Sequence, residues 1–207
     1  MITIIDYGAG NIKSIQNMLK KLGVASEISN EKAVIEKAEK LILPGVGHFD
    51  YGMQQLTKSG LIEPLSKKVL NDKTPILGIC LGAQMLGNKS EEGNEKGLGW
   101  IDMDVVKFQS SASGIKIPHM NWNEVDLKKP SLLFNLPAAS TEFEHPRFYF
   151  VHSYYMQPKN PIDILCTVDY GGEFVAAVEK DNIYGVQFHP EKSHKFGMKL
   201  LENFTKL

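Results

Sequence analysis

The stretch "PILGICLGAQ", residues 75–84, decides the fold expected of this 207-residue chain. An apolar run typical of a buried strand stops at Cys80, and the residues that follow favour a helix. Glycine stands two positions before the cysteine and two positions after it, at Gly78 and Gly82. This spacing is that of a nucleophile elbow, a sharp strand-to-helix turn that holds the nucleophile in strained backbone. Because side chains at the flanking positions would collide across the turn, glycine is needed at both.

The same turn predicts a reactive sulfur. It sets Cys80 at the carboxyl end of a strand, where α/β sheets place their ligands, and at a helix N-terminus, whose partial positive charge favours a thiolate. The alternative is an inert buried cysteine beside packing glycines. We apply that interpretation to Cys166, which lies in the strand-core pattern "ILCTV" without flanking glycines.

Strands and helices alternate along the first half, which predicts an α/β fold with a mostly parallel, twisted sheet and flanking helices. Apolar strands are expected at 2–6, 25–29, 40–45 and 75–80, and helices at 11–23, 31–40, 49–60, 61–72 and 81–88.

The second half is rich in β-branched and aromatic residues, with turn signals such as "DYGG" and "KDN" between the runs. It predicts antiparallel strands, either added to the sheet or forming a second small one, within 100–108, 114–127, 147–156 and 163–189. Residues 194–207 are expected to form an amphipathic helix. Without repeats or a linker, residues 1–207 are expected to form one domain.

Composition excludes several classes of function. The 23 basic and 24 acidic residues give a net charge of -1, which offers no support for a nucleic-acid or membrane partner. No apolar run approaches the ~18 residues of a membrane span, and no signal peptide begins the chain, so we expect a cytoplasmic protein. Two cysteines and the absence of CxxC and HExxH argue against disulfides and a metal site. The chain also lacks P-loop and Rossmann fingerprints, so no cofactor is expected.

A nucleophilic cysteine needs a base, and the base needs a group that orients it. In "GVQFHPEKS" (residues 185–193), His189 ends a strand, Pro190 fixes the next turn, and Glu191 can fold back toward the imidazole. The alternative for "HPE" alone is a surface turn. An oxyanion formed at the site would need donors. Gly45 and Gly47 in "LILPGVGHFD" (residues 41–50) allow a turn to aim its amides at a ligand, and the alternative is an ordinary αβ turn. The amide of Leu81, next after the cysteine, is the natural second donor.

Taken together, "LPGVG", "GICLGAQ" and "QFHPEKS" resemble the triad glutamine amidotransferases, which hydrolyse glutamine and pass ammonia to a synthase. The segments "DYGAGNIKS", "PHMNWN" and "FVHSYY" resemble the glutaminase subunits of imidazole glycerol phosphate synthase in histidine biosynthesis. The similarity covers nearly the whole chain and implies a class I glutamine amidotransferase-like, flavodoxin-like fold.

The resemblance also implies roles for individual residues. The triad would be Cys80, His189 and Glu191, and the oxyanion donors would be Gly47 and Leu81. The residues that bind the amino and carboxyl end of glutamine would be Gln84, Glu92, Ser153 and Tyr154. Within "SEEGNEKG", Glu91 and Glu95 are alternatives to Glu92. The residues at a partner surface near the ammonia exit would be Trp122 and Lys192.

The implied partner is a (β/α)8-barrel cyclase subunit, which would form a heterodimer with this chain and make imidazole glycerol phosphate and an aminoimidazole carboxamide nucleotide. The sequence departs from the family pattern at His48, Ala83 and Asn121. Two alternatives stay open, of which the departures at Ala83 and Asn121 suit the first. One is a paralogous glutaminase that supplies ammonia for amination or amidination of surface-polysaccharide sugars. The other is a cysteine-elbow redox sensor or stress-response hydrolase.

Overall fold

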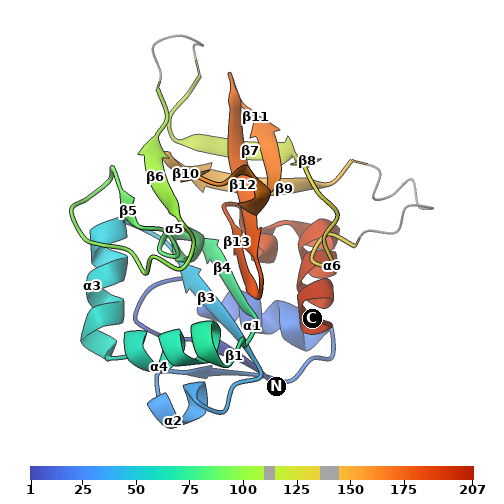
Figure 1. Cartoon of the computed structure of the whole chain (residues 1–207). Coiled ribbons are helices and arrows are strands. Elements are labelled where there is room, and N and C mark those ends of the chain that lie inside the picture. The colour runs from blue at the N-terminus through green and yellow to red at the C-terminus, as the bar shows by residue number, and fades with distance from the viewer. Residues whose placement is uncertain (110–114, 136–144) are drawn as a thin grey trace.

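Parallel strands form one half of the main sheet, as predicted (Figure 1). The computed structural model describes residues 1–109, 115–135 and 145–207, so residue 114 of the predicted segment 114–127 lies outside the described part. The parallel strands run in the order β2-β1-β3-β4-β13, with bounds Ser26–Ser29, Ile2–Ile5, Lys40–Gly45, Ile76–Cys80 and Ile183–Val186. The last of these strands, β13, runs parallel to β4, the strand that ends in the cysteine, although the sequence predicts antiparallel strands within 163–189. It is antiparallel only to its other neighbour, β12.

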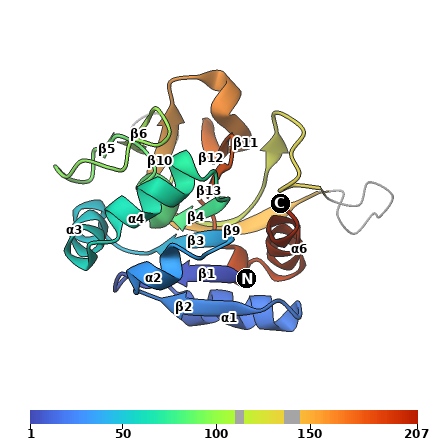
Figure 2. The ribbon, with the colours of Figure 1, turned by 60° about the horizontal axis from the view of Figure 1, so that its bottom comes forward.

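Helices cover both faces of this sheet because successive strand residues point to opposite sides. Ile4 packs into a core with α1 (Ile12–Lys21) and α6 (His194–Thr205), whereas its neighbour Ile5 packs into a second core with α3 (Phe49–Ser59). The second core also includes α2 (Lys32–Ile35), α4 (Ile62–Ser66) and α5 (Leu81–Gln84), and a π-helical segment, Lys67–Asn71, continues α4. Figure 2 shows this separation of the helices.

Two helices are shorter than predicted. The expected helix 31–40 ends at Ile35, where the tighter bonds from Lys37 N to Val34 O and from Ala38 N to Ile35 O turn the chain toward β3. The expected helix 81–88 likewise ends at Gln84 and continues as a turn. In both places the helical sequence pattern continues for several residues past the end of the helix, because the chain there turns toward the next element.

Both alternatives for the second half occur. From β13 the main sheet continues through strands β12, β10, β6 and β5, and β11 and β8 branch from β12. Their bounds are Glu173–Lys180, Tyr154–Pro158, Met103–Lys107, Lys89–Ser90, Ile164–Asp169 and Asp126–Leu127, and a 3-10 turn, Pro161–Asp163, precedes β11. These pairs are antiparallel except β5 with β6. A separate antiparallel pair consists of β7 (His119–Glu124) and β9 (Arg147–His152).

The strand order brings three loops to one edge of the sheet. Gly45 is in register with Cys80, and Val186, just before "QFHPE", is in register with Ile79. The carboxyl ends of β3, β4 and β13 therefore lie side by side, which is where ligands bind in open α/β sheets. In the described part of the chain, no helix has the length and apolar character needed to cross a bilayer.

Candidate active site

The predicted elbow is present at Cys80. Its backbone has φ 53° and ψ -112°, in the region that L-residues rarely adopt, between β4 and α5. A Cβ on Gly82 would lie 1.9 Å from the carbonyl oxygen of Leu43, and one on Gly78 would lie 2.8 Å from Ala83 Cα. The packing of β3, β4 and α5 thus requires both glycines, as the spacing indicated.

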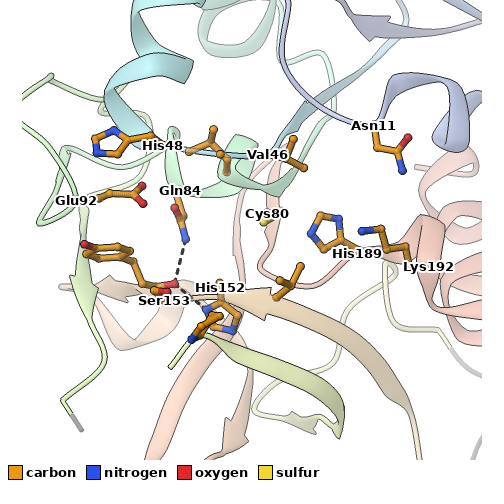
Figure 3. Close-up of a pocket in the computed structure, with 15 residues that line it drawn as sticks. Asn11, Val46, His48, Cys80, Gln84, Glu92, His152, Ser153, His189 and Lys192 are labelled. Atoms are coloured by element: carbon orange, nitrogen blue, oxygen red, sulfur yellow. Dashed lines mark hydrogen bonds between the residues drawn. The ribbon is translucent and has the colours of Figure 1, made fainter. Parts of the chain in front are cut away.

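His189 and Glu191 form the predicted pair. His189 follows β13, and the 3-10 turn Pro190–Lys192 carries Glu191 back toward the imidazole. His189 Nδ1 lies 2.8 Å from Glu191 Oε1, and the two side chains are 2% and 1% exposed. A carboxylate accepts only, so Nδ1 carries a proton and Nε2 is the atom left for chemistry. Among the described residues Nε2 has no hydrogen-bond partner, and Figure 3 shows the imidazole beside Cys80.

Charge governs the protonation of His189. Burial by itself lowers the pKa of the imidazole, but the Cys80 thiolate and the Glu191 carboxylate outweigh burial and raise that pKa to about 10. The imidazolium form of His189 is therefore favoured at neutral pH. A protonated imidazole beside Cys80 can give a proton to a leaving group.

A cavity of about 730 Å³ opens over the cysteine. It is large enough for an amino acid the size of glutamine. Most of the sequence-predicted site residues line it, namely Gly47, Cys80, Leu81, Gln84, Glu92, Ser153, Tyr154, His189 and Lys192. Glu191 lies behind His189, and Trp122 lies outside the cavity.

The "PGVG" turn forms part of the wall. Gly47 has φ 98°, a conformation suited to glycine, and Val46 beside it is 42% exposed. The base of the turn is fixed from below, where the Tyr7 hydroxyl donates to the carbonyl of Pro44 at 2.7 Å. The turn is therefore held by a hydrogen bond at Pro44, whereas the backbone at Gly47 has the conformational freedom of glycine.

The structure distinguishes the three carboxylates of "SEEGNEKG". Glu92 lines the cavity, and its Oε2 accepts from the amide of Phe49 at the start of α3 at 2.8 Å. Glu91 instead accepts from the amide of Lys107 at 2.7 Å, and Glu95 accepts from Gln54 at 3.1 Å. Only Glu92 of the three faces the cavity.

A residue that the sequence interpretation missed lies behind the nucleophile. Gln187 is completely buried, and its Nε2 is 3.8 Å from Cys80 Sγ. Its Oε1 accepts from Gln84 Nε2 at 3.0 Å, and the same Gln84 nitrogen donates to the carbonyl of Tyr154 at 3.1 Å. The available signal was a polar residue inside the apolar run "YGVQF".

A second buried pair, His119 and His152, borders the site. His152 Nε2 lies 3.0 Å from His119 Nδ1, and His152 Nδ1 lies 2.7 Å from the Tyr154 carbonyl oxygen. Burial lowers the pKa of His152 to about 3. His152 lines the cavity but is a neutral imidazole with both nitrogens engaged, so His189 is the histidine free to act as a base.

The two residues expected at a partner surface share a neighbour. Trp122 is 36% exposed, and its ring lies 6.1 Å from that of Tyr149 across the β7–β9 pair. Lys192 Nζ lies 5.5 Å from the centre of the same Tyr149 ring. Met120, also on β7, is 59% exposed. An apolar surface strip on β7 therefore adjoins the mouth of the cavity.

The surroundings of Cys166 fit its interpretation as a structural residue. Cys166 is completely buried in β11, and burial raises the pKa of its thiol. His48 caps α3, with Nδ1 accepting from the amide of Asp50 at 3.2 Å. Within the residues that the structure describes, no group of three or more His, Cys, Asp or Glu side chains could hold a metal ion.

Comparison with known proteins agrees with this geometry. Residues 3–207 match the family model described as glutamine amidotransferase class-I. The chain is 56% identical to "Imidazole glycerol phosphate synthase subunit HisH 2" of Pseudomonas aeruginosa, over the full length of both chains. It is 58% identical to the protein of the same name in Methanococcus maripaludis, with 100% of this chain and 99% of that one covered.

Solved structures support the fold. A crystal structure of a glutamine amidotransferase matches with a TM-score of 0.75 at 17% identity, covering 100% of this chain and 98% of that one. The structure of PurLQS from Thermotoga maritima matches with a TM-score of 0.72 at 19% identity, covering 99% of this chain and 97% of the matched chain. The fold, the full-length family match and the similarity to curated relatives agree: this chain belongs to the class-I glutamine amidotransferase family.

Proposed function

We propose that this chain is the glutaminase subunit of an imidazole glycerol phosphate synthase and uses Cys80, His189 and Glu191 to hydrolyse glutamine. The observation that carries the chemistry is the buried His189–Glu191 pair, 2.8 Å apart, beside a cysteine in strained elbow geometry. The names of the relatives at 56% and 58% identity support the pathway.

The first half-reaction forms a thioester. The Cys80 thiolate attacks the side-chain amide carbon of glutamine, and the negative charge moves to the amide oxygen. Backbone amides of Leu81 and of Gly47, once its peptide is turned inward, would stabilise this oxyanion. His189 then gives its Nε2 proton to the amide nitrogen, the C–N bond breaks, and ammonia leaves.

The second half-reaction restores the enzyme. Neutral His189 takes one proton from water as the water oxygen attacks the thioester carbon, and the C–S bond breaks. The second proton of the water leaves to solvent from the new γ-carboxyl group, which gives glutamate. The proton on His189 and the charge on Cys80 recreate the starting ion pair. Glu191 orients the ring and stabilises its cation throughout.

Two groups suit the amino-acid end of the substrate. Figure 3 shows Glu92 and Gln84 facing each other on one side of the cavity. The Glu92 carboxylate and the Gln84 carbonyl oxygen are acceptors for an α-ammonium group, because the Gln84 nitrogen is already bound to Tyr154 and Gln187. Ser153 and Tyr154, which also line the cavity, would contribute contacts to the α-carboxylate.

The ammonia would pass to a (β/α)8-barrel cyclase subunit docked over the cavity mouth. Met120 and Trp122 offer apolar area there, and Lys192 offers a charge for an acidic residue of the barrel. Free glutaminase activity would waste glutamine, so docking is expected to favour the productive "PGVG" turn. A missing oxyanion donor costs roughly 10²–10³ in rate, enough to keep the isolated chain nearly inactive.

The test is a glutaminase assay of the chain alone and with a purified barrel cyclase and its phosphorylated nucleotide substrate. We expect glutamate formation to rise about a hundredfold or more in the complex. Lys192→Ala should reduce this stimulation more than the basal rate. Cys80→Ala should abolish glutamine-dependent cyclisation but leave ammonia-dependent cyclisation intact. Absence of glutamate formation under every condition would rule out the proposal.

The amination of surface-polysaccharide sugars is a second candidate. Asn121 is exposed on β7 beside the apolar strip, at a position where the family pattern has glycine, so the docking face itself departs from that pattern. The same assay discriminates: stimulation by a sugar-modifying partner, without stimulation by the barrel cyclase of histidine biosynthesis, would favour this alternative.

A further inference from the structure

We propose that Gln187 is a further catalytic residue, whose side-chain amide donates a hydrogen bond to the Cys80 sulfur and stabilises the thiolate. This inference rests on the proposed function, since it assigns a role in the same reaction. The contact is the one between Gln187 Nε2 and Cys80 Sγ, at 3.8 Å. Gln187 is fully buried and does not line the cavity, so it approaches the sulfur from the protein interior.

The direction of this hydrogen bond follows from the Tyr154 carbonyl, which can only accept. Gln84 places one end of its amide 3.1 Å from that oxygen, so that end must be the NH2 group. The same nitrogen has a second hydrogen to donate. This Gln84 nitrogen lies 3.0 Å from the nearer end of the Gln187 side-chain amide. Gln187 must therefore present its oxygen to Gln84, which leaves its own NH2 group for Cys80.

The reverse orientation is excluded at each step. Turning Gln84 would bring two oxygens to 3.1 Å, and turning Gln187 would set its NH2 against the Gln84 NH2 at 3.0 Å. Both arrangements are repulsive in a buried place, where an unsatisfied polar contact is costly. The backbone of β10 thus fixes a donor on the sulfur through two side-chain amides.

The Tyr154 carbonyl is itself held in place. It also accepts from His152 Nδ1 at 2.7 Å, since a carbonyl oxygen cannot donate. His152 is itself buried against His119, with 3.0 Å between His152 Nε2 and His119 Nδ1. The acceptor that orients both glutamines is therefore rigidly positioned.

A donor on the interior side of the sulfur complements His189, which lines the cavity beside Cys80 (Figure 3). The imidazolium gives up its proton during the reaction and then no longer stabilises negative sulfur. The amide of Gln187 keeps its protons, so it stabilises the thiolate both when it attacks and when it leaves the thioester. In a low-dielectric interior such charge-assisted hydrogen bonds are stronger than neutral ones.

The experiment measures the rate of Cys80 alkylation by iodoacetamide from pH 5 to pH 10 in the full chain. Cys166 is completely buried, so labelling reports on Cys80. In Gln187→Met, which keeps the side-chain length but lacks a donor, we expect the midpoint of the profile to move up by about one to two pH units. We also expect kcat to fall about ten- to a hundredfold with little change in KM.

Two further variants test the relay. Gln84→Met should move the midpoint in the same direction, and Gln84→Met with Gln187→Met should move it no further than Gln187→Met alone. The control is Asn203→Leu, which removes another buried amide that donates to two backbone carbonyls but lies in α6. It should leave the midpoint in place.

An unchanged midpoint in Gln187→Met, or an equal movement in Asn203→Leu, would overturn the inference. If Gln187→Met does not fold, Gln187→Glu serves instead, because its carboxylate has the same shape and repels a thiolate. Alkylation requires neither glutamine nor a partner. Failure of the proposed function would appear as absent glutamate formation by the unmodified chain with its cyclase partner and nucleotide, which leaves this measurement intact.

Discussion

The reactive centre depends on charge held by two neighbouring side chains. Cys80 is strained by its elbow, and His189 is held in one tautomer by Glu191 at 2.8 Å. The raised pKa of His189 means that the proton needed by the leaving group is already in place before glutamine binds. At the scale of single residues, therefore, we propose that the imidazole carries the proton transfers and that the carboxylate acts through it.

This difference in role predicts different losses. His189→Ala removes both proton transfers and should lower kcat by about 10⁴ or more, whereas Glu191→Gln should lower it by about 10–10³, because packing still holds the imidazole. Steady-state glutaminase assays of the activated complex would measure both. His145→Ala is the matched control, since that histidine is exposed and pairs only with Glu124 among the described residues. Near-normal turnover in His189→Ala would place the base elsewhere.

At the scale of elements, α3 and the loop that carries Glu92 act as one unit. The Asp50 carboxylate, in the first turn of α3, accepts from the amides of Asn94 and Glu95 at 3.0 and 2.9 Å. These bonds hold the pKa of Asp50 below its usual value. A Cβ on Gly93 would lie 1.9 Å from Asp50 Oδ1, so the loop fits closely against the helix. Glu92 is thus positioned by a helix N-terminus.

Asp50→Ala should therefore weaken glutamine binding, although the Asp50 side chain itself does not contact the substrate. Release of the loop is expected to raise KM several-fold while kcat changes less, because Cys80 and His189 keep their geometry. Glu63→Ala is the matched control, since it removes a first-turn acid from α4 and leaves the loop intact. Kinetics at varied glutamine concentration would measure the effect. An equal KM in the two variants would show that Glu92 does not bind glutamine.

At the scale of the whole molecule, buried histidines set how stability depends on pH. Burial lowers the pKa of His152 to about 3, and burial also lowers the pKa of His119. An unfolded chain has histidines with a pKa near 6.5, so below that pH it binds protons that the native state excludes. Stability should therefore fall as the pH drops from 7 to 5. His189, with its raised pKa, acts in the opposite sense, and only above about pH 6.5.

His152→Gln should reduce this acid dependence. The loss of unfolding free energy between pH 7 and pH 5 should shrink by about 1–2 kcal/mol, because one buried neutral imidazole is gone. Urea unfolding at the two pH values gives the difference directly. His145→Gln, an exposed histidine, should leave the pH 7-to-5 loss as it is. The idea fails if His152→Gln and the unmodified chain lose the same stability over that range.

The local signals in the sequence were sufficient for the first four parallel strands, β1 to β4, and for the elbow. Gly78 and Gly82 meet a steric requirement that lies within five consecutive residues. The segment "HPE" indicates a turn of three residues. Short apolar segments that alternate with helical segments likewise predicted β1 to β4 as parallel strands. Such features depend on neighbours in the chain, so they can be recognised before any tertiary contact forms.

Tertiary structure decided what depends on distant segments. It set β13 parallel to β4, more than a hundred residues earlier, and so brought His189 to Cys80. It selected Glu92 over Glu91 and Glu95, ended α2 and α5 early, and placed Gln187 against the sulfur. Each outcome depends on register and burial between segments far apart in sequence. Spacing along the chain carries no information on these, because a side chain's partner is set by the packing of the sheet.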